Sequence, residues 1–352
     1  TPMLNRRQRQ MCIRDRYAAT TAQRATALAL ESPAGPVHLN LPFREPLVDE
    51  VAAPPIEVPA GISAARPSLI VPPGETVARV AAQLAGRRGL IVAGPESAGL
   101  PAEAIVALAS LLDWPVVADP LSGLRTGDHD LSRVIDRADV LAREPAFTSE
   151  ATPEVVLRFG AAPTSKPLNL WLASIPGLDY LVVDDASAAD AGLRDPDALA
   201  STVVRSDAAL LCEALLRLAP APIEPSWAGR WTEANRAARE SLADTVSVLD
   251  EPFEGATGEA LASALPDGAT LVIGNSMPVR DVDTFFPNTS RDLRLLGTRG
   301  ASGIDGVVST AAGAAAVDGP VVLLIGDLSF FHDQNGLWPV LRHELDLTVL
   351  LV

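Results

Sequence analysis

Short apolar runs alternate with amphipathic segments along most of this chain. Between residues 75 and 183, runs of strand length are separated by segments whose apolar residues recur at helical spacing. The expected strands are Gly89–Ala93, Pro115–Ala118, Val155–Phe159 and Tyr180–Val183, and the expected helices lie near Glu75–Ala85, Ala102–Leu112 and Ser165–Ser174. Apolar strands that alternate with helices indicate βαβ units and a parallel sheet.

The last third of the chain repeats this pattern. A long helix near Trp227–Asp250 leads to a second alternating set, which includes an alanine-rich helix at Val307–Ala316. The expected strands of this set are Thr270–Ile273, Leu293–Leu296, Val321–Ile325 and Leu347–Val352. The fold class predicted for both regions is therefore α/β with parallel sheets.

Two proline-rich stretches, residues 44–75 and 220–225, mark the expected domain boundaries. Because such stretches lack periodicity and break regular structure, they are typical of linkers. They predict a linker at 51–70, a central α/β domain at 71–221, a linker and helix at 222–254, and a last α/β domain at 255–352.

The first 50 residues predict only a helix at Tyr17–Leu30 and a strand at Val37–Pro42. One helix and one strand are too few for a domain, so residues 17–50 are expected to be the end of a domain whose body lies upstream. Residues 1–16 carry five arginines in an otherwise acidic chain and are expected to be non-native. Because the chain stops inside its last expected strand, C-terminal truncation is expected too.

Composition narrows the possible partners and compartments. The net charge of −16 argues against binding to nucleic acid or to an anionic membrane. The two cysteines, Cys12 and Cys212, form no CxxC pair, which favours a cytoplasmic protein without disulfides. No apolar stretch approaches the 18 or so residues of a transmembrane helix. The four histidines lack ligand spacing and predict no metal site of their own.

The strongest chemical signal follows the apolar run Val321–Ile325, where the sequence reads Gly326-Asp327-Leu328-Ser329. Ligands collect at the carboxyl ends of strands in open α/β sheets. Glycine lets the backbone approach a ligand closely, and aspartate offers a hard oxygen ligand for Mg²⁺. The alternative is an aspartate that caps a helix after a buried strand.

Two further polar loops follow expected strands. Residues Gly297–Gly306 contain four glycines, so their backbone N–H groups are exposed for phosphate or cofactor contact, unless the loop is a plain flexible turn. In Gly274–Asp281, Ser276 and Arg280 share one face if a helix begins there, and Arg280 can hold a carboxylate through two hydrogen bonds. The alternative for that segment is an N-cap serine beside a surface arginine. The three loops can converge on one crevice.

These loops carry a family resemblance. Segments Gly274–Asp281, Arg299–Gly306 and Gly326–Gly336 together closely resemble the 2-succinyl-5-enolpyruvyl-6-hydroxy-3-cyclohexene-1-carboxylate synthase (MenD) family, within the thiamine-diphosphate decarboxylase-like superfamily. Gly35–Pro42 resembles the end of the pyrimidine-binding domain of that superfamily, and Leu157–Pro167 resembles the central domain of the family. The resemblance covers residues 17–352 and is most specific in the last 100. It implies that 255–352 is the diphosphate-binding domain.

The resemblance also implies a reaction. The family uses thiamine diphosphate with Mg²⁺ or Mn²⁺ to decarboxylate 2-oxoglutarate and to add the succinyl carbanion to isochorismate. The product is 2-succinyl-5-enolpyruvyl-6-hydroxy-3-cyclohexene-1-carboxylate, in menaquinone biosynthesis. A transferase that forms a homodimer or homotetramer is therefore expected.

Residue roles are carried over from the family motifs. Asp327 is implied to be the metal ligand. The implied cofactor contacts are Ser276, Arg299, Gly300, Ile304, Gly326, Asp327, Leu328 and Ser329. The implied substrate contacts are Asn275, Ser276, Arg280, Arg299 and Lys166, of which the three basic residues would supply positive charge for dicarboxylates.

Two family features fall outside this sequence. The activating glutamate is expected upstream, and the asparagine that completes the metal site is expected at or just after Val352. No catalytic residue is therefore assigned, and this chain alone is expected to be inactive and to bind cofactor poorly.

One alternative keeps the cofactor but changes the reaction, to an acetolactate synthase, an oxalyl-CoA decarboxylase or a pyruvate-decarboxylase-like enzyme. The other alternative is a non-catalytic α/β nucleotide-binding or regulatory module.

Overall fold

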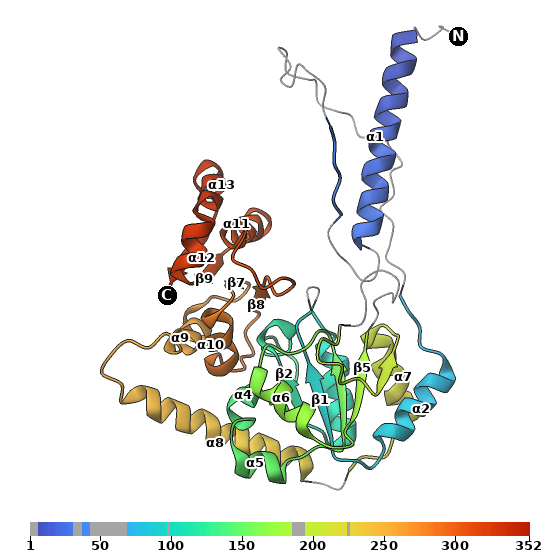
Figure 1. Cartoon of the computed structure of the whole chain (residues 1–352), viewed down its shortest axis with the longest axis vertical. Helices are drawn as coiled ribbons and strands as arrows, with labels where there is room; N and C mark the ends of the chain where they lie inside the picture. Colours follow the sequence, from blue (N-terminus) through green and yellow to red (C-terminus); the bar gives the residue numbers. More distant parts are fainter. Residues whose placement is uncertain (1–5, 31–36, 43–68, 97–98, 185–193, 224–225) are drawn as a thin grey trace. The chain divides into compact units, whose positions relative to one another are not determined.

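A computed structural model describes residues 6–30, 37–42, 69–96, 99–184, 194–223 and 226–352 (Figure 1). The chain divides into two units, residues 1–70 with 185–192 and residues 71–184 with 193–352. No helix in these described ranges is long and apolar enough to cross a membrane.

The first unit contains helix α1 (Arg6–Leu30), drawn in blue in Figure 1. The helix predicted at Tyr17–Leu30 is confirmed, and it begins earlier, so residues 6–16 are also helical. The non-native origin of residues 1–16 stays a prediction. The strand predicted at 37–42 is wrong, because a strand exists only where it pairs and these residues have no regular structure. Most of the predicted linker, residues 51–68, lies outside the described residues.

The second unit contains a six-stranded parallel sheet of order β3-β2-β1-β4-β5-β6. Its strands are β1 (Gly89–Ala93), β2 (Val116–Ala118), β3 (Val134–Ile135), β4 (Val155–Phe159), β5 (Asp179–Val183) and β6 (Thr202–Val204). In the middle of the sheet, Ile91 lies opposite Val116 on one side and Leu157 on the other. Every residue of β1 and β4 is buried, which is the pattern of parallel strands covered on both faces.

Helices cover this sheet in two groups. Helix α7 packs against α2 and α3, whereas α4 packs against α6 and α8. Their bounds are α2 (Gly74–Leu84), α3 (Ala102–Leu112), η1 (Pro120–Ser122), α4 (Ala138–Leu141), α5 (Pro145–Glu150), α6 (Lys166–Ser174), α7 (Ala208–Leu218) and α8 (Trp227–Ser247).

The first turns of α8 belong to the core of the six-stranded sheet. The indole N–H of Trp227 donates to the Gly89 carbonyl oxygen over 2.6 Å, and Trp231 is fully buried. The ring of Trp231 meets that of Phe147 edge-on, with centroids 4.9 Å apart, and lies 5.9 Å from that of Trp171. The N-terminal part of the segment predicted to be a linker and helix therefore packs into the core around the six-stranded sheet.

A four-stranded parallel sheet of order β10-β9-β7-β8 forms the rest of the unit. Its strands are β7 (Thr270–Ile273), β8 (Arg294–Gly297), β9 (Val321–Ile325) and β10 (Leu347–Leu351). Its helices are α9 (Ala256–Ala264), α10 (Met277–Phe285), α11 (Val307–Val317), α12 (Asp327–His332), η2 (Gln334–Gly336) and α13 (Leu337–His343). The helices α9 and α10 pack together, and α11 packs on β9 and β10. The predicted α/β class with parallel sheets is confirmed.

Sequence patterns missed the two edge strands of the six-stranded sheet. Strand β3 has two residues and β6 has three, too few to produce an alternation or a long apolar run. Helices α4, α5 and α7 were also not predicted. The domain boundaries proposed from composition stay predictions.

Candidate functional site

Three of the predicted loops follow neighbouring parallel strands of the four-stranded sheet. Strand β7 lies between β8 and β9, and all three run in the same direction. The carboxyl ends of parallel strands meet at one edge of the sheet, where open α/β sheets bind ligands. The glycine-rich loop, the Gly274–Ser276 turn and the Gly326-Asp327 motif therefore share one edge.

Asn275 joins two of these loops. Its side-chain amide nitrogen donates to the carbonyl oxygen of Gly303 over 2.7 Å and to the hydroxyl of Thr298 over 3.0 Å. Its side-chain oxygen accepts a 3.0 Å hydrogen bond from Nη1 of Arg299. Asn275 is 5% exposed, so it is the buried centre of this hydrogen-bond network. The network holds the glycine-rich loop on the end of β7 and fixes the half-buried Arg299 there.

Ser276 holds an unusual backbone conformation at the start of α10. Its φ of 71° and ψ of −124° lie where non-glycine residues are rare, so the surroundings must stabilise this geometry. The side chain is exposed and does not cap the helix. Arg280, also exposed, lies one turn later, and its Nη1 is 3.9 Å from the sulfur of Met277. The helix begins at Met277, one residue after Ser276, so the shared face expected for Ser276 and Arg280 stays a prediction.

The Gly326-Asp327 motif opens helix α12. Asp327 is exposed, and its Oδ1 accepts a 2.7 Å hydrogen bond from the backbone N–H of Leu328, whose side chain is also exposed. Ser329, by contrast, is buried, and its hydroxyl has no hydrogen-bond partner among the described residues. One exposed carboxylate and one unsatisfied buried hydroxyl therefore lie within three residues of each other at the end of β9.

Helix α12 and the turn after it fasten the far end of the glycine-rich loop. Nε2 of His332 lies 2.7 Å from Oδ1 of Asp305. The carboxylate of Asp333 accepts hydrogen bonds from the backbone N–H of Ser309, over 2.7 Å, and from its hydroxyl. Asp333 thereby satisfies a free N–H in the first turn of α11. The loop that carries Gly300 and the exposed Ile304 is therefore held at both ends.

Lys166 lies apart from this set, as the exposed first residue of α6 beside the six-stranded sheet. The hydroxyl of the preceding Ser165 accepts from the backbone N–H of Leu168 and donates to Oδ1 of Asp139 over 2.7 Å. Within the described ranges, Lys166 makes no hydrogen bond or ion pair with the other predicted site residues. The structure thus joins Asn275 and Arg299 by a hydrogen bond and places Lys166 beside the other sheet.

The donor groups at the end of β9 fit a metal-bound diphosphate. Among the described residues there is no cluster of three or more His, Cys, Asp or Glu side chains that could hold a metal ion alone. Mg²⁺ commonly binds through one or two carboxylates together with phosphate oxygens and water, and Asp327 supplies one such carboxylate. A phosphate oxygen would also give the buried hydroxyl of Ser329 an acceptor. Val352, near which the second ligand is expected, donates its N–H to the Ile325 carbonyl oxygen over 3.0 Å, beside Gly326.

Comparison with known proteins decides the family. A family model described as the middle domain of thiamine pyrophosphate enzymes matches residues 75–273, more than half of the chain. This chain belongs to that thiamine pyrophosphate enzyme family. The match runs from α2 through the six-stranded sheet to the end of β7, so it includes the strand that leads to Asn275.

Curated relatives agree with the resemblance found in the sequence. Proteins from Geobacillus thermodenitrificans, Geobacillus kaustophilus and Chloroflexus aurantiacus are 48%, 47% and 42% identical to this chain, each over 96% of its residues. All three are named 2-succinyl-5-enolpyruvyl-6-hydroxy-3-cyclohexene-1-carboxylate synthase. The chain spans 57–58% of the length of these relatives. The predicted resemblance is confirmed.

Helix α10 also carries a pH-sensitive carboxylate. Burial raises the pKa of Asp281 to about 6, the charge of Glu254 adds to this rise, and Arg280 opposes it. An acid with a raised pKa binds its proton more tightly in the folded chain than in the unfolded chain. Its deprotonated form therefore destabilises the fold, an effect that is absent below pH 4 and complete above pH 6. After allowance for solvent screening, Asp281→Asn should raise the free energy of unfolding by about 1 kcal/mol at pH 8.

Thermal unfolding of Asp281→Asn and of the parent chain, measured from pH 4.5 to pH 8, tests this expectation. The gain should shrink steadily as the pH falls through 6. A difference in melting temperature that does not change with pH would show that the Asp281 pKa is not raised.

Proposed function

We propose that the protein to which this chain belongs is a thiamine-diphosphate-dependent transferase. It would decarboxylate 2-oxoglutarate and add the resulting four-carbon unit to isochorismate, giving 2-succinyl-5-enolpyruvyl-6-hydroxy-3-cyclohexene-1-carboxylate for menaquinone biosynthesis. The observation that carries this proposal is the hydrogen-bond network of Asn275 with Thr298, Gly303 and Arg299. This network fixes a guanidinium at the edge of the four-stranded sheet that also bears Asp327. The family match and the names of the relatives support the choice of cofactor and reaction.

The loop after β9 is proposed to hold the diphosphate and its metal ion. Asp327 would ligate Mg²⁺ or Mn²⁺, and the hydroxyl of Ser329 would donate to a phosphate oxygen. The backbone of Gly326 and Leu328 would lie beside the diphosphate. Thiamine diphosphate, when bound, supplies the electron sink that decarboxylation of a 2-oxoacid requires.

The glycine-rich loop is proposed to contact the rest of the cofactor. A Cβ added to Gly300 would meet no atom within 4 Å, so the backbone there is open to a ligand. Ile304 is 40% exposed and offers an apolar surface to the cofactor rings. Ser276, which follows Asn275, and Arg299, which donates a hydrogen bond to Asn275, complete the proposed cofactor contacts.

Substrate binding is proposed to rest on local positive charge. Both substrates carry carboxylates, whereas the chain has a net charge of −16, so recognition needs arginine or lysine close to the reacting atoms. Arg299 and Arg280 would bind substrate carboxylates, with Asn275 and Ser276 beside them. Lys166 would reach the same substrates from the six-stranded sheet.

A homodimer or homotetramer is the proposed assembly. Helices α12 and α13 expose four large apolar side chains, Leu328, Phe331, Trp338 and Leu341, each at least 70% accessible. Exposed apolar residues in such a number favour burial against another polypeptide. By family resemblance the partner surface is the pyrimidine-binding domain of a second copy. A cytoplasmic location, and the absence of nucleic-acid and membrane partners, stay predictions from composition.

A chimera gives the direct test of this function. Residues 71–352 would replace the matching segment of the Geobacillus thermodenitrificans relative, which supplies the remaining length of the protein. With thiamine diphosphate and Mg²⁺, the chimera should consume 2-oxoglutarate in the presence of isochorismate and release CO₂ and the expected product. Turnover of pyruvate in place of 2-oxoglutarate would favour another 2-oxoacid enzyme. A folded chimera that binds nucleotides but turns over neither acid would favour the binding module.

A further inference from the structure

The C-terminal end of helix α10 is held by two buried arginines from outside the four-stranded sheet. The last carbonyl oxygens of a helix have no partner inside it, so they need donors from elsewhere. Arg125 and Arg137, which follow β2 and β3, donate to these carbonyls at the end of α10. We name these two residues the α10 clamp.

Arg125 makes the most contacts with the helix end. Its Nη1 donates to the carbonyl oxygens of Asp283 and Phe286 over 2.8 and 3.3 Å, and its Nη2 forms a 2.7 Å ion pair with the Asp283 carboxylate. Its Nε donates to the carbonyl oxygen of Ala118, the last residue of β2, over 2.7 Å. Because Arg125 is 1% exposed, this guanidinium connects the six-stranded sheet directly to α10 without intervening solvent.

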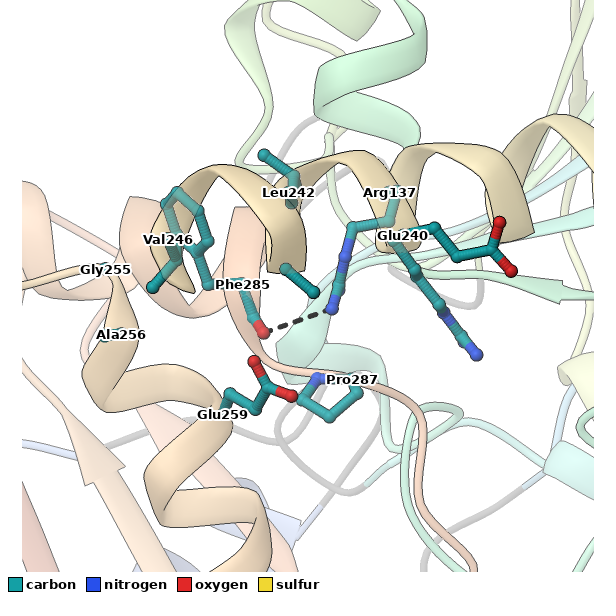
Figure 2. A pocket seen from close by; sticks show the side chains of 11 residues that line it. Arg137, Glu240, Leu242, Val246, Gly255, Ala256, Glu259, Phe285 and Pro287 are labelled. Carbon is teal, nitrogen blue, oxygen red and sulfur yellow. Dashed lines mark hydrogen bonds between the residues drawn. The ribbon is translucent and has the colours of Figure 1, made fainter. Parts of the chain in front are cut away.

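Arg137 binds the same helix end from another side. Its Nη1 donates to the Phe286 carbonyl oxygen over 3.0 Å, and its Nη2 donates to that of Phe285 over 3.2 Å. Figure 2 shows Arg137 reaching toward Phe285 from beside α8, on the wall of a cavity of about 240 Å³. The Asp136 carboxylate pairs with Arg137 and, over 2.6 Å, with Arg239 of α8. Arg137 is therefore held by Asp136 on one side and by α10 on the other.

A third contact links α10 to the helix that begins with Lys166. The hydroxyl of Thr284 lies 3.4 Å from Oδ2 of Asp139, whose Oδ1 accepts from the hydroxyl of Ser165. Ser165 is the N-cap residue of α6. One buried carboxylate thus contacts both the end of α10 and the start of α6.

The other end of α10 carries the proposed site residues. Nine helical residues span only about 13 Å, and a helix of that length moves as a rigid rod. At its N-terminus, Ser276 has a strained positive φ that persists only when neighbouring structure enforces it. Asn275 fixes the chain just before that residue, and the α10 clamp fixes the helix after it.

We infer that Arg125 and Arg137 are positioning residues, which set the placement of Ser276 and Arg280 through α10. This inference rests on the proposed function only where it gives Ser276 and Arg280 a role in ligand binding. The mechanical part, which is the coupling of the two ends of α10, can be measured without any ligand.

Hydrogen–deuterium exchange on the whole 352-residue chain tests the coupling. Arg137→Met removes two donors to α10 and leaves Asp136 paired with Arg239. We expect exchange at the amides of 274–282 to become about tenfold faster, while exchange in β1 and β4 stays unchanged. Arg87→Gln is the matched control, because Arg87 pairs with Asp179 over 2.6 Å at the amino end of the six-stranded sheet. Unchanged exchange at 274–282 in a folded Arg137→Met chain would overturn the inference.

Two additional measurements keep the test decisive. Arg137→Lys retains the charge beside Asp136 but not the planar guanidinium. It should accelerate exchange at 274–282 about threefold, and it replaces Arg137→Met in the test if that variant does not fold. In the active chimera, Arg137→Met should raise the KM for 2-oxoglutarate about tenfold and change kcat less than twofold. A purely structural role would instead lower the fraction of active enzyme and leave KM unchanged. A chimera without parent activity would refute the proposed function and leave the exchange result to decide the coupling.

Discussion

Asp327→Asn should weaken Mg²⁺-dependent binding of thiamine diphosphate to the chimera by about 100-fold. The side chain is exposed at the end of β9, and its only described hydrogen bond is to the N–H of the next residue, so its loss should leave the fold intact. A contact between charged groups is worth about 1.5–3 kcal/mol, and each 1.4 kcal/mol is a factor of about ten in affinity. Asparagine keeps the size and one oxygen but removes the negative charge that a divalent cation requires.

Isothermal titration of the cofactor, with Mg²⁺ and with excess chelator, measures this effect. Asp318→Asn is the matched control, since Asp318 is an exposed aspartate just after α11, before β9 begins, at the opposite end of that strand. It should leave cofactor affinity within twofold of the parent value. Equal affinity of the Asp327→Asn and parent chimeras, both dependent on Mg²⁺, would place the metal on other residues.

Strand positions were the most predictable part of the fold. A parallel strand covered on both faces is apolar at nearly every position, so β1 and β9 appear in the sequence as unbroken apolar runs. Strand β4 is interrupted only by Arg158, which is buried and pairs with Asp195. The glycine and polar residues that follow β7, β8 and β9 are informative for the same reason, because they are abrupt departures from such runs. The shared edge of the three loops then follows from the direction of parallel strands.

The contacts that hold the site could not be predicted from local patterns. Arg125 and Asp283 are 158 residues apart, and nothing near either residue in the sequence distinguishes a buried ion pair from two surface charges. The bonds from Asn275 to Thr298 and Gly303 likewise require the register of β7 on β8, which only the folded sheet determines. Asn275 was identified through family resemblance, and its buried, fully bonded amide emerged only from the structure.

Gly94→Ala is expected to cause the largest loss of stability. A Cβ at this position would lie 1.7 Å from the carbonyl oxygen of Ala161, so the loops after β1 and β4 would have to separate. That movement would break two hydrogen bonds, from the Gly94 N–H to the Phe159 oxygen over 2.9 Å and from the Ala161 N–H to the Pro95 oxygen over 3.0 Å. Overpacking costs about 1–3 kcal/mol and each hydrogen bond about 1 kcal/mol, which gives a loss of about 3–5 kcal/mol.

Thermal unfolding should show this loss as a decrease in melting temperature of about 10 °C. The matched control is Gly313→Ala, because Gly313 is an exposed interior residue of α11 and a Cβ there would meet no atom within 4 Å. It should raise the free energy of unfolding by about 0.5–1 kcal/mol, since alanine favours the helix that glycine disfavours. If both substitutions changed the melting temperature by the same small amount, the close approach of the β1 and β4 loops would be absent in solution. The loop after β4 leads to Ser165, the N-cap residue of α6, so the packing at Gly94 also positions the chain that enters this helix.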